Sequence, residues 1–154
     1  LGAGIGMALA GKLRKRNYHV WVVIGDGETQ EGSVWEAAMS APRWRLDNLT
    51  AILDANRLQN DACVVDLMPV EPLADKWRAF GWNVQEIDGH DMEAVVRSLE
   101  GSRARDGLPT MIIARTVKGK GVSYMEDVVE WHGKAPCREE AEEALAQIRR
   151  CIRE

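Results

Sequence analysis

The segment VWVVIGDGETQEG, residues 20–32, decides the fold of this chain. Its first part, Val20–Ile24, is a short apolar run rich in β-branched side chains. Such a run predicts a strand covered on both faces, as in a parallel sheet. The glycine-bearing part, residues 25–32, predicts a turn, because glycine adopts positive φ without steric penalty. Ser33, followed by Glu36, forms a capping-box pattern and predicts the start of a helix. Because of Pro42, this helix should end by residue 44 or 45.

The rest of the chain alternates apolar β-branched runs with amphipathic segments, which predicts an α/β fold with a mainly parallel sheet flanked by helices. The length of 154 residues fits one domain. Strands are expected at Leu49–Leu53, Val84–Ile87 and Met111–Ala114, helices at Leu1–Arg16, Leu73–Phe80, Asp91–Arg105 and Arg138–Arg153, and an irregular stretch at Lys118–Pro136.

Composition excludes several functional classes. The net charge is −4 and the basic residues are scattered, so nucleic-acid binding is not expected. No apolar run reaches the ~18 residues that a membrane span needs. The three cysteines are odd in number and lack CxxC spacing, which favours a reducing cytoplasm over a disulfide framework. The first residue is Leu1 and it opens directly into a helix-like run, so we expect residues 1–154 to be one domain truncated at its amino-terminal end.

Two polar residues follow the first two predicted strands. Asp26 lies between Gly25 and Gly27, and Asn56 comes 30 positions later, after the second strand. If these strands are neighbours, both side chains emerge at the same sheet edge, where ligands bind in such folds. Their oxygens, with the Leu58 carbonyl turned inward, are ligands that Mg²⁺ accepts. The Gly25–Asp26–Gly27 segment alone, or Asn56 alone, would more often be part of a plain turn. Together, each after an apolar strand, they predict a metal and phosphate site.

The sequence resembles the transketolase family of thiamine-diphosphate enzymes. GDG followed by Asn after an apolar strand is similar to the thiamine-diphosphate motif. The segments GDGETQEGSVWEAAMSAPRWRLDNLTAILDANRLQ, PLADKWRAFGWNVQEIDGHDMEAV and TVKGKGVSYMEDVVEWHGKAP resemble transketolases, above all their separately encoded amino-terminal subunits. The resemblance implies a thiamine-diphosphate-binding fold and a set of roles. Asp26, Asn56 and Leu58 would hold the metal, Gly25, Asp26, Gly27, Asn56, Lys118 and His132 would contact the cofactor, and His132 would also act in catalysis.

The resemblance also implies an activity. A transketolase transfers a two-carbon ketol unit between sugar phosphates in the pentose phosphate pathway, with thiamine diphosphate and Mg²⁺ (or Ca²⁺ or Mn²⁺). The cofactor site would need a pyrimidine-binding, carboxy-terminal transketolase subunit within a dimer-based oligomer, so the chain alone should be inactive. Two alternatives stay open: a non-catalytic truncated module of the same fold, and a related enzyme such as deoxyxylulose-phosphate synthase, against which the motif WHGKAP weighs.

Several residues have expected structural roles. Trp35, Trp44, Trp77 and Trp82 are expected in the core or at a subunit interface. The segments Ser33–Trp44, with Trp35 and Met39, and Gly2–Leu13, with its small residues, should carry the apolar surface for a partner. Glu31 matches a family glutamate at the subunit interface, and Lys134 is a further candidate for a phosphate contact.

Overall fold

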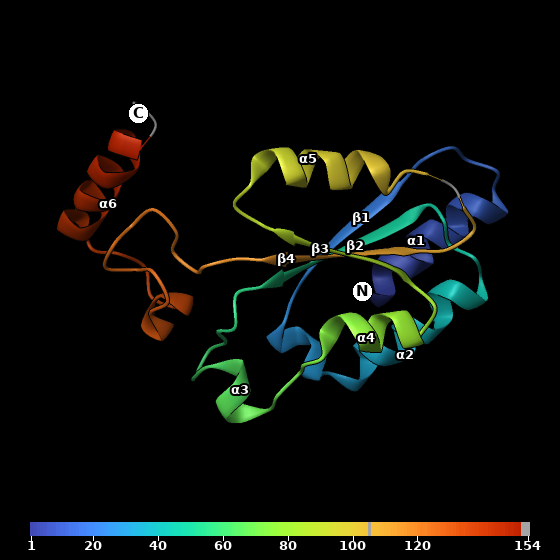
Figure 1. Cartoon of the computed structure of the whole chain (residues 1–154), viewed down its shortest axis with the longest axis horizontal. Helices are drawn as coiled ribbons and strands as arrows, with labels where there is room; N and C mark the ends of the chain where they lie inside the picture. Colours follow the sequence, from blue (N-terminus) through green and yellow to red (C-terminus); the bar gives the residue numbers. More distant parts are fainter. Residues whose placement is uncertain (105, 152–154) are drawn as a thin grey trace.

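A computed structural model describes residues 1–104 and 106–151 of the chain. Its centre is a four-stranded, all-parallel sheet with the strand order β1-β2-β4-β3 (Figure 1). The strands are β1 (Val20–Gly25), β2 (Leu49–Ala55), β3 (Asn83–Asp88) and β4 (Thr110–Arg115). All four expected strands are present, and β1 and β2 are neighbours, so the α/β prediction is confirmed.

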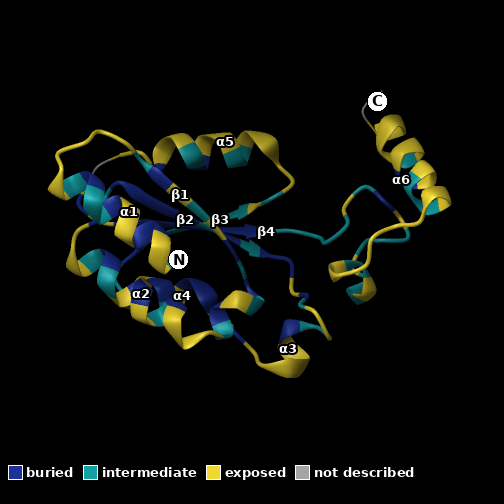
Figure 2. Ribbon diagram, turned by 180° about the vertical axis from the view of Figure 1, so that it is seen from behind, coloured by how far each residue is buried: buried dark blue, intermediate teal, exposed yellow. Residues whose placement is uncertain are grey.

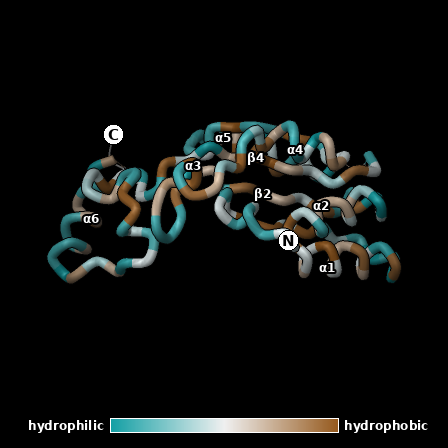
Figure 3. The backbone as a smooth tube through the Cα atoms, turned by 90° about the horizontal axis from the view of Figure 1, so that it is seen from below, coloured by the Kyte–Doolittle hydropathy of each residue, from teal (hydrophilic) through white to brown (hydrophobic). Residues whose placement is uncertain are grey.

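Helices cover the sheet in two layers. One face carries α1 (Gly2–Leu13), α2 (Gly32–Arg43) and α4 (Leu73–Ala79), and the other carries α5 (Met92–Gly101) (Figure 1). The loops contain the short η1 (Gly27–Gln30), α3 (Val64–Leu67) and η2 (Val129–His132). The last helix, α6 (Arg138–Cys151), lies apart from the body formed by the sheet and the other long helices (Figure 3).

The core fills the space between the sheet and α1, α2 and α4. Figure 2 shows the buried residues concentrated in the strands and in the helix faces that meet them. Leu49, Ala51 and Leu53 of β2 point to this face, as the period of two in a strand requires. Helix α1 approaches β1 closely at Gly4, where an added Cβ would lie 2.2 Å from a methyl of Val22. Gly4, and Gly11 beside Tyr18, therefore serve packing within the chain, whereas the exposed Gly2 and Gly6 have open space beside them.

One expectation for β1 is wrong. Val20 and Ile24 are buried, but Trp21 is 43% exposed and Val23 is 68% exposed. The reason is topological: α5 follows β3 and packs over it, whereas β1 lies at the opposite edge of the sheet. The apolar run therefore predicts the strand correctly, but only one of its faces is covered among the described residues.

Several helix ends also differ from the predictions. Ser33 does not cap α2, because the helix starts at Gly32 and Glu31 holds the capping position; the Ser33 hydroxyl instead donates to Glu31 Oε2 at 3.3 Å. Helix α1 ends at Leu13, since Lys15 adopts a positive φ of 52°. Asp91 precedes α5 and caps it by accepting the N–H groups of Glu93 and Ala94. Helix α5 already ends at Gly101, and the expected ends Arg105 and Arg153 lie outside the described residues.

Candidate functional site

The carboxyl ends of β1 and β2 bring the predicted polar residues together. In the parallel register Gly25 lies opposite Asp54, so that Asp26 and Asn56 both follow directly beyond the paired strands. The backbone N–H of Arg57, the residue after Asn56, donates to Asp26 Oδ2 at 2.6 Å. The expectation that the two loops meet at one edge of the sheet is therefore confirmed.

A pocket of about 430 Å³ opens at this edge. Every site residue predicted from the sequence except Lys134 lines it, together with Glu31 and four residues to which the sequence assigned no role. The predicted set is Gly25, Asp26, Gly27, Asn56, Leu58, Lys118 and His132, and the additional set is Glu28, Asp54, Gln59 and Asn60. Of these additional residues, Asp54 carried a recognisable signal, since it is an acidic residue near the end of a buried parallel strand.

Asp26 is a buried carboxylate without a cationic side chain bound to it among the described residues. Its oxygens accept the N–H groups of Gly27, at 2.8 Å, and of Arg57. Burial raises the pKa of Asp26 above its usual 3.8, the two backbone hydrogen bonds oppose that rise, and the neighbouring Asp54 carboxylate adds to it. The net shift of the pKa is upward, chiefly because burial disfavours the charged form of the carboxyl group.

Asn56 and Leu58 add neutral oxygens beside this carboxylate. The Asn56 side chain accepts the backbone N–H of Leu58 through Oδ1 at 2.9 Å, and its amide nitrogen donates to Asp54 Oδ2 at 2.8 Å. Both residues are buried. Asn56 thus stabilises its own turn, as expected if it only had a structural role. The second lone pair of its amide oxygen is still available to a metal ion.

Two basic side chains line the same pocket from the segment after β4. Lys118 follows β4 and is half-buried, and His132 is the exposed last residue of η2. The backbone between them folds back at Gly119, whose φ is +73°, and Asp127 N–H donates to the Lys118 carbonyl at 3.0 Å. Lys134 lies outside the pocket lining, where its ammonium pairs with Glu140 at 3.0 Å and covers the Trp131 ring.

The donor set at the pocket fits a hard divalent cation bound together with a phosphate. The described residues contain no cluster of three or more His, Cys, Asp or Glu side chains that could hold a metal by themselves. Mg²⁺ commonly takes only one or two protein carboxylates and completes its shell with water and substrate phosphates. One buried carboxylate, with no cationic side chain paired to it among the described residues and with two neutral oxygens nearby, matches that pattern. An added Cβ at Gly25 would meet no atom within 4 Å, so the space beside this glycine is open.

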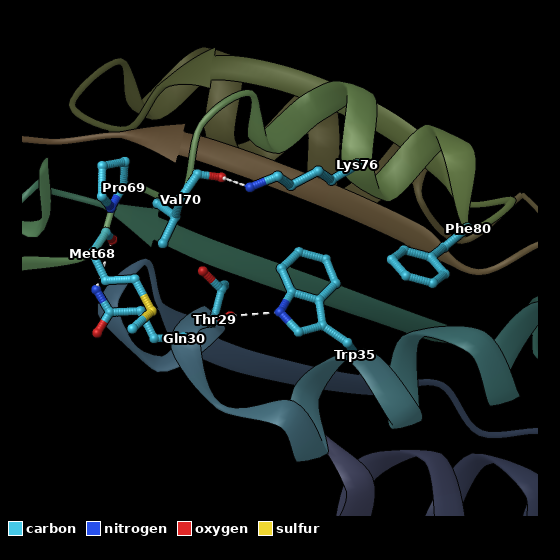
Figure 4. Close-up of a pocket in the computed structure, with 8 residues that line it drawn as sticks. All are labelled: Thr29, Gln30, Trp35, Met68, Pro69, Val70, Lys76 and Phe80. Carbon is cyan, nitrogen blue, oxygen red and sulfur yellow. Dashed lines mark hydrogen bonds between the residues drawn. The ribbon is translucent and has the colours of Figure 1, made fainter.

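A second pocket, of about 280 Å³, lies between η1, α2 and α4 and has a different character (Figure 4). Its walls are mostly apolar, with Trp35 and Phe80 facing Met68, Pro69 and Val70. The polar groups of Trp35 and Lys76 at its rim already make hydrogen bonds within the chain. The Trp35 indole donates to the Thr29 carbonyl at 2.7 Å, and the Lys76 ammonium donates to the Val70 carbonyl at 2.6 Å (Figure 4). We therefore expect this pocket to make apolar contacts rather than to take part in catalysis.

Of the six tryptophans in the chain, the four expected in the core or at a subunit interface divide between core and surface. Trp77 and Trp82 are buried, and Trp35 is half-buried with its ring 5.2 Å from that of Trp77. Trp35 therefore packs within the chain, whereas Trp44 and Met39 on the same helix segment are exposed.

In the part of the chain that the structure describes, no helix is long and apolar enough to cross a membrane.

Comparison with known proteins gives consistent matches. The family model described as "Transketolase, thiamine diphosphate binding domain" matches residues 10–150. The chain is 44% identical over 148 residues to an apulose-4-phosphate transketolase subunit of Phocaeicola vulgatus, covering 96% of this chain and 53% of the relative. It is 43% identical over 146 residues to the 6-deoxy-6-sulfo-D-fructose transketolase subunit SqwG of a Clostridium species, with coverages of 95% and 53%.

The fold is also similar to a solved structure. Transketolase from Campylobacter jejuni superimposes with a TM-score of 0.88 at 30% sequence identity, over 94% of this chain and 24% of that one. The chain thus spans about half the length of the two curated subunits and a quarter of the longer enzyme.

Proposed function

This chain belongs to the transketolase family, as its match to the thiamine diphosphate binding domain shows, and we propose on that premise that it forms the diphosphate half of a transketolase active site. The activity would be transfer of a two-carbon ketol unit between sugar phosphates. The observation that carries the proposal is the convergence of Asp26, Asn56, Leu58, Lys118 and His132 on one pocket at the carboxyl edge of the sheet.

In this proposal Asp26, Asn56 Oδ1 and the Leu58 carbonyl hold Mg²⁺, with Ca²⁺ or Mn²⁺ as substitutes. The support is the buried Asp26 carboxylate, which hydrogen-bonds only to backbone N–H groups among the described residues. Gly25 leaves room for a diphosphate, and Gly27 lines the same pocket with the Gln59 side chain packed beside it. The Lys118 ammonium, without an ion-pair partner in residues 1–104 and 106–151, adds positive charge. Thiamine diphosphate, when bound, would supply the nucleophilic carbon that cleaves and forms the carbon–carbon bond.

His132 is the proposed catalytic residue of this half-site. Its imidazole lines the pocket from η2 and is exposed, so it can reach a substrate that approaches the pocket from solvent. A histidine in this place can hold or move a proton at a sugar hydroxyl, because imidazole is the side chain that most often acts as a general acid or base.

The complete site would need a second polypeptide. The two curated relatives reported above are named as subunits, and we propose that the partner is a pyrimidine-binding, carboxy-terminal transketolase subunit, in a dimer-based oligomer. Exposed apolar side chains support this, among them Met7 on α1, Met39 on α2 and Met68 beside the second pocket. Without that partner the chain should be inactive. The three cysteines are free, which supports a reducing cytoplasmic location.

The test replaces the proposed charged ligand. In the reconstituted complex, Asp26→Ala should weaken binding of Mg²⁺ with thiamine diphosphate by about tenfold or more, equivalent to about 1.4 kcal/mol, in titration calorimetry. Asp75→Ala serves as the control, because Asp75 is an exposed carboxylate on α4 whose one ion pair with a described residue is to Arg78. Circular dichroism checks that each variant is folded. Unchanged affinity in a folded Asp26→Ala complex would remove Asp26 from the metal shell.

The same titration addresses the second candidate, a non-catalytic module of the same fold. A complex that binds the cofactor and transfers ketol units excludes it, whereas a chain that associates with the partner subunit without binding cofactor supports it.

A further inference from the structure

Asp54 connects the two loops that form the candidate site. It lies near the end of β2, two residues before Asn56, and lines the pocket beside it. Its Oδ2 accepts the Asn56 amide N–H at 2.8 Å, and its Oδ1 accepts the Thr116 hydroxyl from the segment after β4. Asp54 thus joins the loop that carries Asn56 to the segment that leads to Lys118.

A primary amide has two chemically different ends of nearly the same shape, so it needs its neighbours to select one orientation. An ionised carboxylate only accepts hydrogen bonds, so Asp54 can face the NH₂ end of Asn56 and not its oxygen. The backbone N–H of Leu58 donates to Asn56 Oδ1 at 2.9 Å and selects the same orientation from the other end. Without Asp54, this single backbone contact would have to orient the side chain.

We propose that Asp54 is a positioning residue, whose carboxylate holds the Asn56 amide so that Oδ1 faces the cation bound in the pocket. The inference rests on the proposed function and assigns a new role within the same site. Residues that hydrogen-bond to a metal ligand without binding the metal themselves orient that ligand in many proteins, and they are needed for full metal affinity. Through Thr116, Asp54 also sets where the segment bearing Lys118 leaves β4.

A different role for Asp54 would be purely electrostatic, as a second negative charge near the cation. The two roles predict different results for a neutral isostere. The side-chain oxygen of Asp54→Asn can still accept the Asn56 N–H, and its NH₂ group can donate to the Thr116 hydroxyl oxygen, so orientation is kept while charge is lost. Asp54→Ala removes both.

The experiment measures Mn²⁺ binding in the presence of thiamine diphosphate, followed by electron paramagnetic resonance of free Mn²⁺, in the chain assembled with its pyrimidine-binding subunit. We expect Asp54→Ala to raise the dissociation constant about 10- to 100-fold and Asp54→Asn to restore most of the affinity. Asp88→Ala is the matched control. Asp88 ends β3 and accepts the N–H of His90 at 2.8 Å, but it makes no hydrogen bond to Asn56 among the described residues. Wild-type affinity in Asp54→Ala, or an Asp54→Asn as weak as Asp54→Ala, would overturn the proposal.

A second measurement needs no cofactor and remains decisive if Asp54→Ala does not fold. In nuclear magnetic resonance of the metal-free wild-type chain, the side-chain NH₂ of Asn56 should exchange with water more slowly than that of the exposed Asn60 in the same pocket. Equal exchange rates would refute the hydrogen bond to Asp54. Failure of the wild-type assembly to bind Mn²⁺ with thiamine diphosphate would instead refute the proposed function, and the exchange measurement separates the two outcomes.

Discussion

Trp82 completes the hydrogen bonding of α2 at the point where proline interrupts it. Pro42 lies in the last turn of α2 and has no N–H, so it cannot donate to the Ala38 carbonyl four residues earlier. The Trp82 indole donates to that carbonyl at 2.9 Å, and both residues are buried. A side chain from the loop after α4 therefore replaces a backbone hydrogen bond of α2, the helix that follows the glycine loop of the candidate site.

Trp82→Phe should destabilise the chain by about 1–3 kcal/mol, because a buried carbonyl without its donor carries a desolvation penalty of that size. For a domain of this length, each kcal/mol lowers the melting temperature by about 2–4 °C. Urea unfolding followed by far-ultraviolet circular dichroism measures the change. Trp44→Phe is the matched control, because Trp44 is 51% exposed, and it should shift stability by no more than about 0.5 kcal/mol.

A double-mutant cycle separates the hydrogen bond from the packing of the ring. In the Pro42→Ala background the new N–H at position 42 can donate to the Ala38 carbonyl, so Trp82→Phe should cost about 1 kcal/mol less than in the wild type. An equal loss in the two backgrounds would show that the indole contributes only by packing. A loss for Trp82→Phe no larger than that for Trp44→Phe would refute the reasoning altogether.

Two further predictions concern pH and association. Burial raises the pKa of Glu71, but hydrogen bonds from the Arg115 side chain and the Leu73 N–H outweigh that effect and bring the pKa below its usual 4.5. Because the pKa is lower in the folded state, the stabilisation is complete above pH 4.5 and is lost as the pH falls through the folded value. Between pH 5 and 3, the free energy of unfolding of Glu71→Gln in urea titrations should therefore fall less than that of the wild type. The same decrease in both proteins would contradict this. In light scattering, the isolated chain should self-associate through apolar side chains such as Met7 and Met39, and a monomer that does not bind the pyrimidine-binding subunit would rule out the interface.

The surface expected for a partner was only partly predictable. The pattern of the α2 segment suggested both Trp35 and Met39 as contact residues, and Met39 is exposed. Trp35 instead packs against Trp77 and Phe80, with its ring 5.2 Å and 5.5 Å from theirs. The position of Trp35 depends on α4, which lies about 40 residues later in the chain, and no local pattern reports such a contact.

The sequence by itself determined the four strands, their parallel α/β arrangement and the two motifs around Asp26 and Asn56. These features depend on apolar runs and turn residues that are contiguous in the chain, so local physics is sufficient to predict them. Only the tertiary structure decided that Trp21 and Val23 stay exposed, because that depends on which strand α5 covers. It also decided that Asp54 joins Asn56 to Thr116, 62 residues away from Asp54 along the chain. Such a link arises from strand order and register, which place residues side by side only after the whole sheet has formed.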